Sequence, residues 1–189
     1  YEQPEMPEGS EEGIIKGLYK FKSCNNPQVR LVGSGSILRE SIKAAKLLQN
    51  YGIDSEVWSA TSFNLLRKEG MEVERENQLN PTLEQKTSYV SECFNDSDIP
   101  IIATTDYMRS YAEQIRPYIT SQYTVLGTDG FGRSDSREKL REFFEIDSGS
   151  ITRAAAYSLF KENKIDKVML EKIYNDMNID ASKPNPWEV

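Results

Sequence analysis

The sequence has no histidine, and this absence removes several kinds of chemistry at once. The common serine and cysteine nucleophiles need histidine as their general base, and histidine is also the most frequent ligand for transition metals. Catalysis by this chain would therefore have to rest on carboxylates, arginine, lysine, tyrosine or backbone amides. A self-sufficient hydrolase of the Ser-His-Asp type and a zinc enzyme are both disfavoured.

Cysteine, long apolar runs and clustered positive charge are also scarce. The chain has 2 cysteines, Cys24 and Cys93, which is too few for a disulfide framework, so we expect reduced thiols and a cytoplasmic location. No apolar run approaches the roughly 18 residues of a membrane-spanning helix, and no signal-peptide pattern is present. The net charge is -7 without any basic stripe, so nucleic acid and anionic membranes are poor candidates as partners.

The length of the chain is sufficient for one domain. Its 189 residues can bury a sizeable core but are too few for two ordinary domains. Both ends are polar and contain proline, which predicts a linker over residues 1–12, a globular core over 13–180 and a tail over 181–189. The sequence begins with Tyr1 rather than methionine, so we expect it to be a piece of a longer polypeptide.

Short apolar runs alternate with longer amphipathic ones along the chain, which is typical of an α/β layer fold with a largely parallel sheet. The apolar runs predict strands at residues 17–21, 29–33, 55–60, 99–104 and 123–127. The amphipathic runs predict helices at residues 37–51, from a cap at Thr61 or Ser62 to an end at Asn80-Pro81, and at 89–94, 107–115, 136–144, 151–163 and 167–177. Gly70 should weaken the second of these helices in its middle.

A turn of small residues, Gly33, Ser34, Gly35 and Ser36, follows the second predicted strand and opens a helix. This is the setting of a dinucleotide-binding fingerprint, and a helix N-terminus can hold an anion through its free N–H groups. The third glycine of the fingerprint is missing, because Leu38 stands in its place, and the next strand ends without a carboxylate for a ribose. We favour the simpler interpretation, a tight turn that needs small residues, and keep a free-standing anion- or nucleotide-binding module as the alternative.

A second glycine-rich segment, Gly127-Thr-Asp-Gly-Phe-Gly-Arg133, follows the last predicted strand. Phe131 lies between two of its glycines, and we expect the ring to anchor the loop in an apolar pocket. Asp135 is expected to cap the next helix, with Glu138 completing a capping box. The sequence thus predicts an architectural role for this loop.

Three arginines lie in or just after the same loop: Arg133, Arg137 and Arg141. Such a cluster beside a helix start could hold a phosphate or a carboxylate. The simpler interpretation, which we favour, is that these arginines pair with Asp129, Asp135 and Glu138. Asp106 and Asp129 each follow a strand end, which is where sites usually lie in a parallel sheet, but capping and turn roles explain both equally well.

From Gly127 to Glu138 the sequence closely resembles the C-terminal domain of bacterial homodimeric pyruvate dehydrogenases. The similarity extends over nearly the whole chain and includes residues 1–9, 12–17, 31–38, 104–108, 112–116, 178–181 and 185–186. A looser pattern, Phe131-Gly-x-Ser134 with a following helix, is similar to transketolases in general. The resemblance implies a three-layer α/β/α sandwich with a mixed, mostly parallel five-stranded sheet. One departure lies at residues 77–81, where relatives tend to carry a histidine just before the proline.

The same resemblance implies the activity of the longer polypeptide. It implies a subunit that decarboxylates pyruvate with thiamine diphosphate and Mg²⁺ and acetylates the lipoyl group of a dihydrolipoyl acetyltransferase. The preceding parts of the subunit and a second identical subunit would hold the cofactor, because the family's diphosphate, metal and activating-carboxylate motifs are missing here. We therefore expect no catalytic, cofactor-binding or metal-binding residue in this chain and a role in assembly. An apolar face near Leu18, Tyr19, Phe21 and residues 107–111 should be exposed when those parts are absent.

Overall fold

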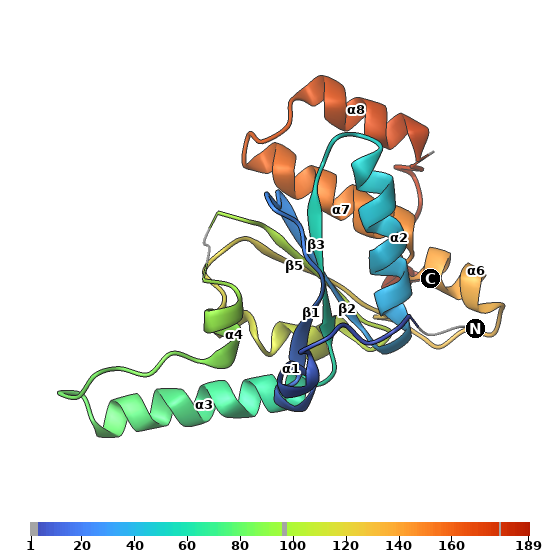
Figure 1. Ribbon diagram of the computed structural model, residues 1–189. Coiled ribbons are helices and arrows are strands. Elements are labelled where there is room, and N and C mark those ends of the chain that lie inside the picture. Colours follow the sequence, from blue (N-terminus) through green and yellow to red (C-terminus); the bar gives the residue numbers. More distant parts are fainter. Residues whose placement is uncertain (1–3, 96–97, 178) are drawn as a thin grey trace.

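Figure 1 shows a five-stranded sheet with helices on both faces, in a computed structural model that describes residues 4–95, 98–177 and 179–189. The strands lie in the order β1-β3-β2-β4-β5. Strand β1 is antiparallel to β3, and the pairs β3-β2, β2-β4 and β4-β5 are parallel. The mixed, mostly parallel sheet is thus confirmed. The strands are β1 (Leu18–Lys22), β2 (Val29–Ser34), β3 (Ser55–Ala60), β4 (Ile101–Thr104) and β5 (Tyr123–Leu126).

The two faces of the sheet carry separate apolar cores. Helices α2 and α7 cover one face with α8 packed on α7, and helices α3, α4 and α5 cover the other (Figure 1). The three-layer arrangement is therefore confirmed. The helices are α1 (Glu11–Lys16), α2 (Leu38–Gln49), α3 (Phe63–Leu79), α4 (Tyr89–Cys93), α5 (Arg109–Glu113), α6 (Arg137–Phe143), α7 (Ser148–Lys161) and α8 (Lys167–Asp176), with short 3-10 helices η1 (Gly35–Ile37), η2 (Arg116–Tyr118) and η3 (Pro186–Glu188).

The central strands form because they are buried from both sides. All six residues of β3 are buried, as are five of the six in β2, which is expected of parallel strands between two helical layers. The buried residues of these two strands include the polar Arg30, Ser55, Glu56 and Ser59. The helix starts are set by local caps: Ser62 Oγ accepts a hydrogen bond from the Leu65 N–H at 3.2 Å. Gly52, with φ of 73°, ends the turn after α2 in the left-handed region.

Helix α3 extends beyond the sheet as an arm (Figure 1). Its first part is packed, with Phe63, Leu66 and Gly70 buried, whereas its end and the following residues up to Thr87 are almost entirely exposed. The returning segment is fastened to the helix by Asn77, which donates to the Lys86 carbonyl at 2.9 Å and accepts from the Lys86 N–H at 2.8 Å. Residues 77–81 therefore lie at the tip of this arm.

Both ends of the described chain take part in the fold. Helix α1 begins at Glu11, so the end of the expected linker 1–12 is helical, and Pro186 in the expected tail 181–189 is buried. Residues 1–3 of that linker and Asn178 of the matched segment 178–181 lie outside the described residues. Among the described helices, none combines the length and the apolar character that crossing a bilayer requires.

Candidate functional site

The candidate site lies where the direction of the chain connections changes. Strand β2 leads through α2 to β3 on one side, whereas β4 leads through α5 to β5 on the other. The carboxyl ends of β2 and β4 are adjacent, and in open α/β sheets such a switch point leaves a crevice in which ligands commonly bind. The two ends are bridged by Ser36 Oγ and Asp106 Oδ2 at 3.4 Å.

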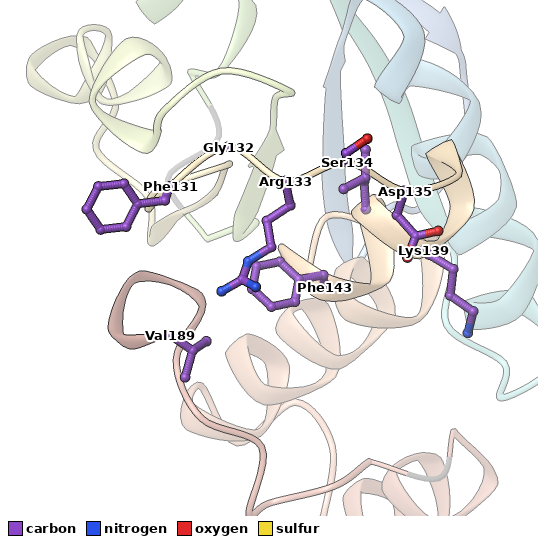
Figure 2. Close-up of a pocket in the computed structure, with 9 residues that line it drawn as sticks. Phe131, Gly132, Arg133, Ser134, Asp135, Lys139, Phe143 and Val189 are labelled. Carbon is purple, nitrogen blue, oxygen red and sulfur yellow. The ribbon is translucent and has the colours of Figure 1, made fainter.

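An open cleft of about 600 Å³ is present at this point. Ser36, Asp106 and Thr128 lie on its sheet side, and Arg137 and Arg141 line it from the α6 side. A second hollow of about 590 Å³, drawn in Figure 2, adjoins it and shares Arg133 and Asp135 of the same loop. The structure thus brings the arginine segment and the turn of small residues, which are far apart in the sequence, to one edge of the sheet.

The turn from Gly33 to Ser36 is tight because a helix lies directly against a strand. A Cβ on Gly33 would lie 2.5 Å from Leu38 Cα and 2.8 Å from Ser41 Oγ, so only glycine allows this approach. Gly35 has φ of 54° and faces open space, so its requirement is conformational. Ser34 makes no cap hydrogen bond to the helix that follows. These observations support the simpler interpretation of the motif.

Arg141 is fixed in the wall of the cleft by a residue that the sequence did not single out. Its Nη1 lies 2.9 Å from Glu40 Oε1 and its Nη2 donates to Ser36 Oγ at 3.1 Å. Glu40 also accepts from Lys43 Nζ at 3.0 Å and from the Ser148 N–H at 3.2 Å, and it is 5% exposed. Glu40 therefore joins α2, α6 and α7. In the sequence, Glu40 could have been noticed only as a carboxylate in the first turn of a predicted helix, on the face that is buried.

The expected pairing of the three arginines with nearby carboxylates is wrong for Arg141, which pairs with Glu40 instead. Asp129 pairs with Arg109, whose N–H donates to Asp129 Oδ1 at 3.1 Å and whose Nε lies 3.3 Å from Oδ2. The guanidinium of Arg133 lies over the Phe143 ring at 4.7 Å. Arg133 points toward this ring in Figure 2.

Two expectations for the loop at residues 127–137 are also wrong. Phe131 is 80% exposed and fills no pocket of this chain. The cap of α6 is Ser136, whose Oγ accepts from the Lys139 N–H at 3.4 Å, while Asp135 accepts from the Ser136 N–H at 2.6 Å. Of the three glycines, only Gly130 has a positive φ, of 114°. The other two are Gly127, where a Cβ would lie 2.7 Å from the Tyr107 carbonyl oxygen, and Gly132, which faces open space.

The shifted cap gives a testable difference between two adjacent residues. Ser136→Ala is expected to lower the free energy of unfolding by about 1 kcal/mol, because it removes the side-chain acceptor at the N-cap of α6. Asp135→Ala should have a smaller effect, since among the described residues the Asp135 side chain accepts a hydrogen bond only from the neighbouring Ser136 N–H. Urea unfolding of both variants would measure this. A larger loss for Asp135→Ala than for Ser136→Ala would place the cap at Asp135 after all.

The described residues offer little nucleophilic or metal-binding chemistry. Within residues 4–95, 98–177 and 179–189, no group of three or more His, Cys, Asp or Glu side chains could hold a metal ion. Burial raises the pKa of the Cys93 thiol, which keeps it protonated and a poor nucleophile. What the cleft can do is bind or pack, through arginines, hydroxyls and apolar surface.

Comparisons with known proteins agree with the fold described above. Residues 17–147 match the model of a family described as the transketolase-like TK C-terminal domain. The pyruvate dehydrogenase E1 component of Cupriavidus necator is 47% identical over 194 residues, covering 100% of this chain and 22% of the relative. That of Pseudomonas aeruginosa is 50% identical over 193 residues, with 100% and 22% covered, and that of Escherichia coli K12 is 47% identical over 190 residues, with 98% and 21% covered. The chain spans about a fifth of the length of these curated relatives.

Solved structures show the same fold at much lower identity. A transketolase from Leishmania mexicana superposes with a TM-score of 0.59 at 20% identity, covering 79% of this chain and 19% of that one. A transketolase mutant from Pichia stipitis gives a TM-score of 0.57 at 19% identity, with 82% and 20% covered. At such identities the likeness concerns the architecture alone.

Proposed function

Since this chain belongs to the transketolase-like C-terminal domain family, we propose that it is the C-terminal domain of a thiamine-diphosphate-dependent pyruvate dehydrogenase subunit of the single-chain, homodimeric type. The observation that carries this proposal is the identity of 47–50% over nearly all of this chain to pyruvate dehydrogenase E1 components. A free-standing anion- or nucleotide-binding module is not favoured, because these relatives carry the matching segment as only about a fifth of a longer polypeptide.

In this proposal the complete subunit decarboxylates pyruvate in the cytoplasm and passes the acetyl group to the lipoyl group of a dihydrolipoyl acetyltransferase. Bound thiamine diphosphate would supply the carbanion-stabilising chemistry that decarboxylation requires. The residues of this chain do not fit that cofactor: its magnesium would find no cluster of acidic ligands among the described residues. The arginines of the cleft also stand beside Asp106 and Asp135, which would oppose a diphosphate. We therefore place cofactor and catalysis in the rest of the subunit and its identical partner, and assign this domain to assembly.

The test is an assay of the complete polypeptide that contains this chain. With thiamine diphosphate, Mg²⁺ and a lipoylated acetyltransferase, it should consume pyruvate and acetylate the lipoyl group. A complete polypeptide that carries the cofactor and the acceptor but leaves pyruvate unchanged would overturn the proposal.

The 189-residue chain alone is expected to bind no thiamine diphosphate and to decarboxylate no pyruvate. The physical reason is that the described residues contain no cluster of acidic side chains that would hold the Mg²⁺ of the cofactor. Calorimetric titration with the cofactor and Mg²⁺ checks this directly, with the complete polypeptide as the positive control. A micromolar Kd for the 189-residue chain would contradict the prediction.

A further inference from the structure

Four large apolar side chains stand exposed beside the cleft, and we call them the edge patch: Tyr107, Met108, Phe131 and Trp187. Their exposed fractions are 60%, 59%, 80% and 48%. They come from three segments that are distant in the sequence, namely the turn after β4, the loop after β5 and the 3-10 helix η3. Val189, next to η3, lines the same hollow as Phe131 (Figure 2).

The edge patch is held in place by contacts beneath it. The Tyr107 ring stacks on Tyr111 with centroids 4.9 Å apart, and Tyr111 meets the buried ring of Phe63 at 6.0 Å. The guanidinium of Arg109 lies 5.1 Å from the Trp187 ring, and Asp129 in the loop holds the same arginine. A fixed aromatic surface binds with a smaller loss of conformational entropy than a mobile one.

The loop and the C-terminal segment also approach each other through a glycine. A Cβ on Gly130 would lie 2.8 Å from the Pro186 carbonyl oxygen and 3.1 Å from Trp187 Cα. This contact positions Phe131 and Trp187 relative to one another, although their side chains remain largely in solvent. The loop is therefore architectural in a different way than the sequence predicted: it presents the ring of Phe131 outward.

The face expected from the sequence is only partly the face that the structure exposes. Leu18 is fully buried in the core on the α3, α4 and α5 side of the sheet. Tyr19 and Phe21 are half-buried, so β1 is not part of an exposed apolar surface. The expectation holds for Tyr107 and Met108. The additional members, Phe131 and Trp187, come from segments that the sequence assigned to an internal anchor and to a tail.

We infer that the edge patch is the surface on which this domain docks the part of its own polypeptide that lies outside this chain, an inference that rests on the proposed function. The curated relatives carry roughly four-fifths of their length outside the matching segment, which provides the occupant. Exposed apolar patches and outward aromatic side chains flanked by arginine are features of interfaces, and aromatic residues are the usual anchors. The occupant then has an apolar pocket for Phe131 and an acidic group opposite Arg133.

Charge argues against a second copy of the same patch as the occupant. In a two-fold contact the patch would meet a second copy of itself, and the two chains, each with a net charge of -7, would repel one another. Arg133 is paired with no carboxylate of the described residues and lies on the rim of the patch, over Phe143. A carboxylate on the occupant would favour association with Arg133, and the four residues of the patch include none.

Hydroxyl-radical footprinting of the complete polypeptide tests the inference. Oxidation at Met108, Phe131 and Trp187 would be measured by mass spectrometry and normalised to the same residues in the urea-unfolded polypeptide. Tyr157 on α7 is the reference, because it is 50% exposed and lies outside the patch. We expect the three patch residues to be oxidised at least about five-fold more slowly than Tyr157 after this normalisation.

Two variants sharpen the test. In the complete polypeptide Phe131→Ala should raise oxidation at Met108 and Trp187 several-fold, because it removes the anchor of the contact, whereas Tyr157→Ala should leave both rates unchanged. In the 189-residue chain Phe131→Ala should leave the midpoint of thermal unfolding where it is, since the ring is largely in solvent.

Three outcomes separate the possibilities. Oxidation of the patch at the rate of Tyr157 in the complete polypeptide would overturn the inference, and so would protection that disappears on dilution of the subunit dimer, which would assign the patch to a second copy. Pyruvate consumption is measured on the same samples. A protected patch in a polypeptide without that activity would overturn the proposed function alone, and an open patch in an active one would overturn the docking surface alone.

Discussion

Replacing Glu56 by glutamine is expected to lower the free energy of unfolding by about 3–5 kcal/mol, because the change removes a buried carboxylate beside the buried guanidinium of Arg30. Glu56 lies on the buried strand β3, and its side chain is 5% exposed. Chemical unfolding of the wild type and the variant, with the midpoint and slope fitted separately, measures the loss. A reduced midpoint with an unchanged slope would identify it as a loss of stability.

The size of this effect follows from the number of groups that share one carboxylate. Arg30 Nε lies 3.1 Å and Trp58 Nε1 lies 3.2 Å from Glu56 Oε2, while Lys20 Nζ lies 2.6 Å from Oε1. Lys20 reaches solvent and can be hydrated in the variant, but the Arg30 side chain is 4% exposed. Its guanidinium also lies over the Phe94 ring at 5.6 Å, so it cannot leave without opening the core.

An exposed ion pair provides the matched control. Glu72 lies 3.7 Å from Lys68 on α3, with both side chains mostly in solvent, and Glu72→Gln should change stability by no more than about 0.5 kcal/mol. The double variant Arg30→Met, Glu56→Leu should recover most of the loss, since it removes both buried charges together. If Glu56→Gln lowers the free energy of unfolding no more than Glu72→Gln does, the buried network around Glu56 contributes little to stability.

The layered fold could be predicted from the sequence because short runs that contain apolar residues alternate with longer amphipathic runs. The prediction for residues 55–60 coincides with β3, and that for residues 29–33 is one residue shorter than β2. Helices were less well bounded where they are short. The helix expected at residues 107–115 is α5 followed by the 3-10 helix η2, and Pro117 stands inside η2 rather than after the last helical turn.

The candidate site was less predictable, for reasons that differ from residue to residue. Asp135 and Ser136 are both good N-caps, so local sequence cannot choose between them. The partner of Arg141 is Glu40, 101 residues away, and only the packing of α2 against α7 and α6 brings them together. The glycines on both sides of Phe131 suggested that its ring fills a pocket within this domain. Local sequence cannot tell whether such a pocket lies in the same domain or on another surface that packs against it.

Gly70 shows the same limit inside a helix. The sequence indicated a weak point in α3, since glycine has a low helix propensity. In the structure a Cβ at this position would lie 2.4 Å from Cζ of the Tyr118 ring. The residue is therefore needed for close packing of α3 against a ring 48 positions later in the chain. A propensity argument alone cannot detect such a contact.

Gly33→Ala is the second substitution expected to have a large effect, a loss of about 3 kcal/mol of unfolding free energy, at the upper end of overpacking. The added methyl group would meet Leu38 Cα at 2.5 Å and Leu38 N at 2.9 Å, both of which are backbone atoms. A side chain could rotate away, but a backbone can yield only if the start of α2 moves off the sheet. That movement would separate Ile37 and Leu38 from the apolar core between the sheet and helices α2 and α7. Urea unfolding measures the loss.

Gly35, two residues later, separates steric conflict from backbone strain. A Cβ there would meet nothing within 4 Å, but φ is 54°, so Gly35→Ala should cost about 1–2 kcal/mol through the left-handed conformation alone. Gly35→Asn should cost less than Gly35→Ala, because asparagine tolerates this region better, whereas Gly33→Asn should be worse than Gly33→Ala. If Gly33→Ala proves milder than Gly35→Ala, α2 can move off the strand at little cost. The turn would then be adaptable, and the cleft formed by Ser36 and Arg141 would not depend on close packing of this helix against β2.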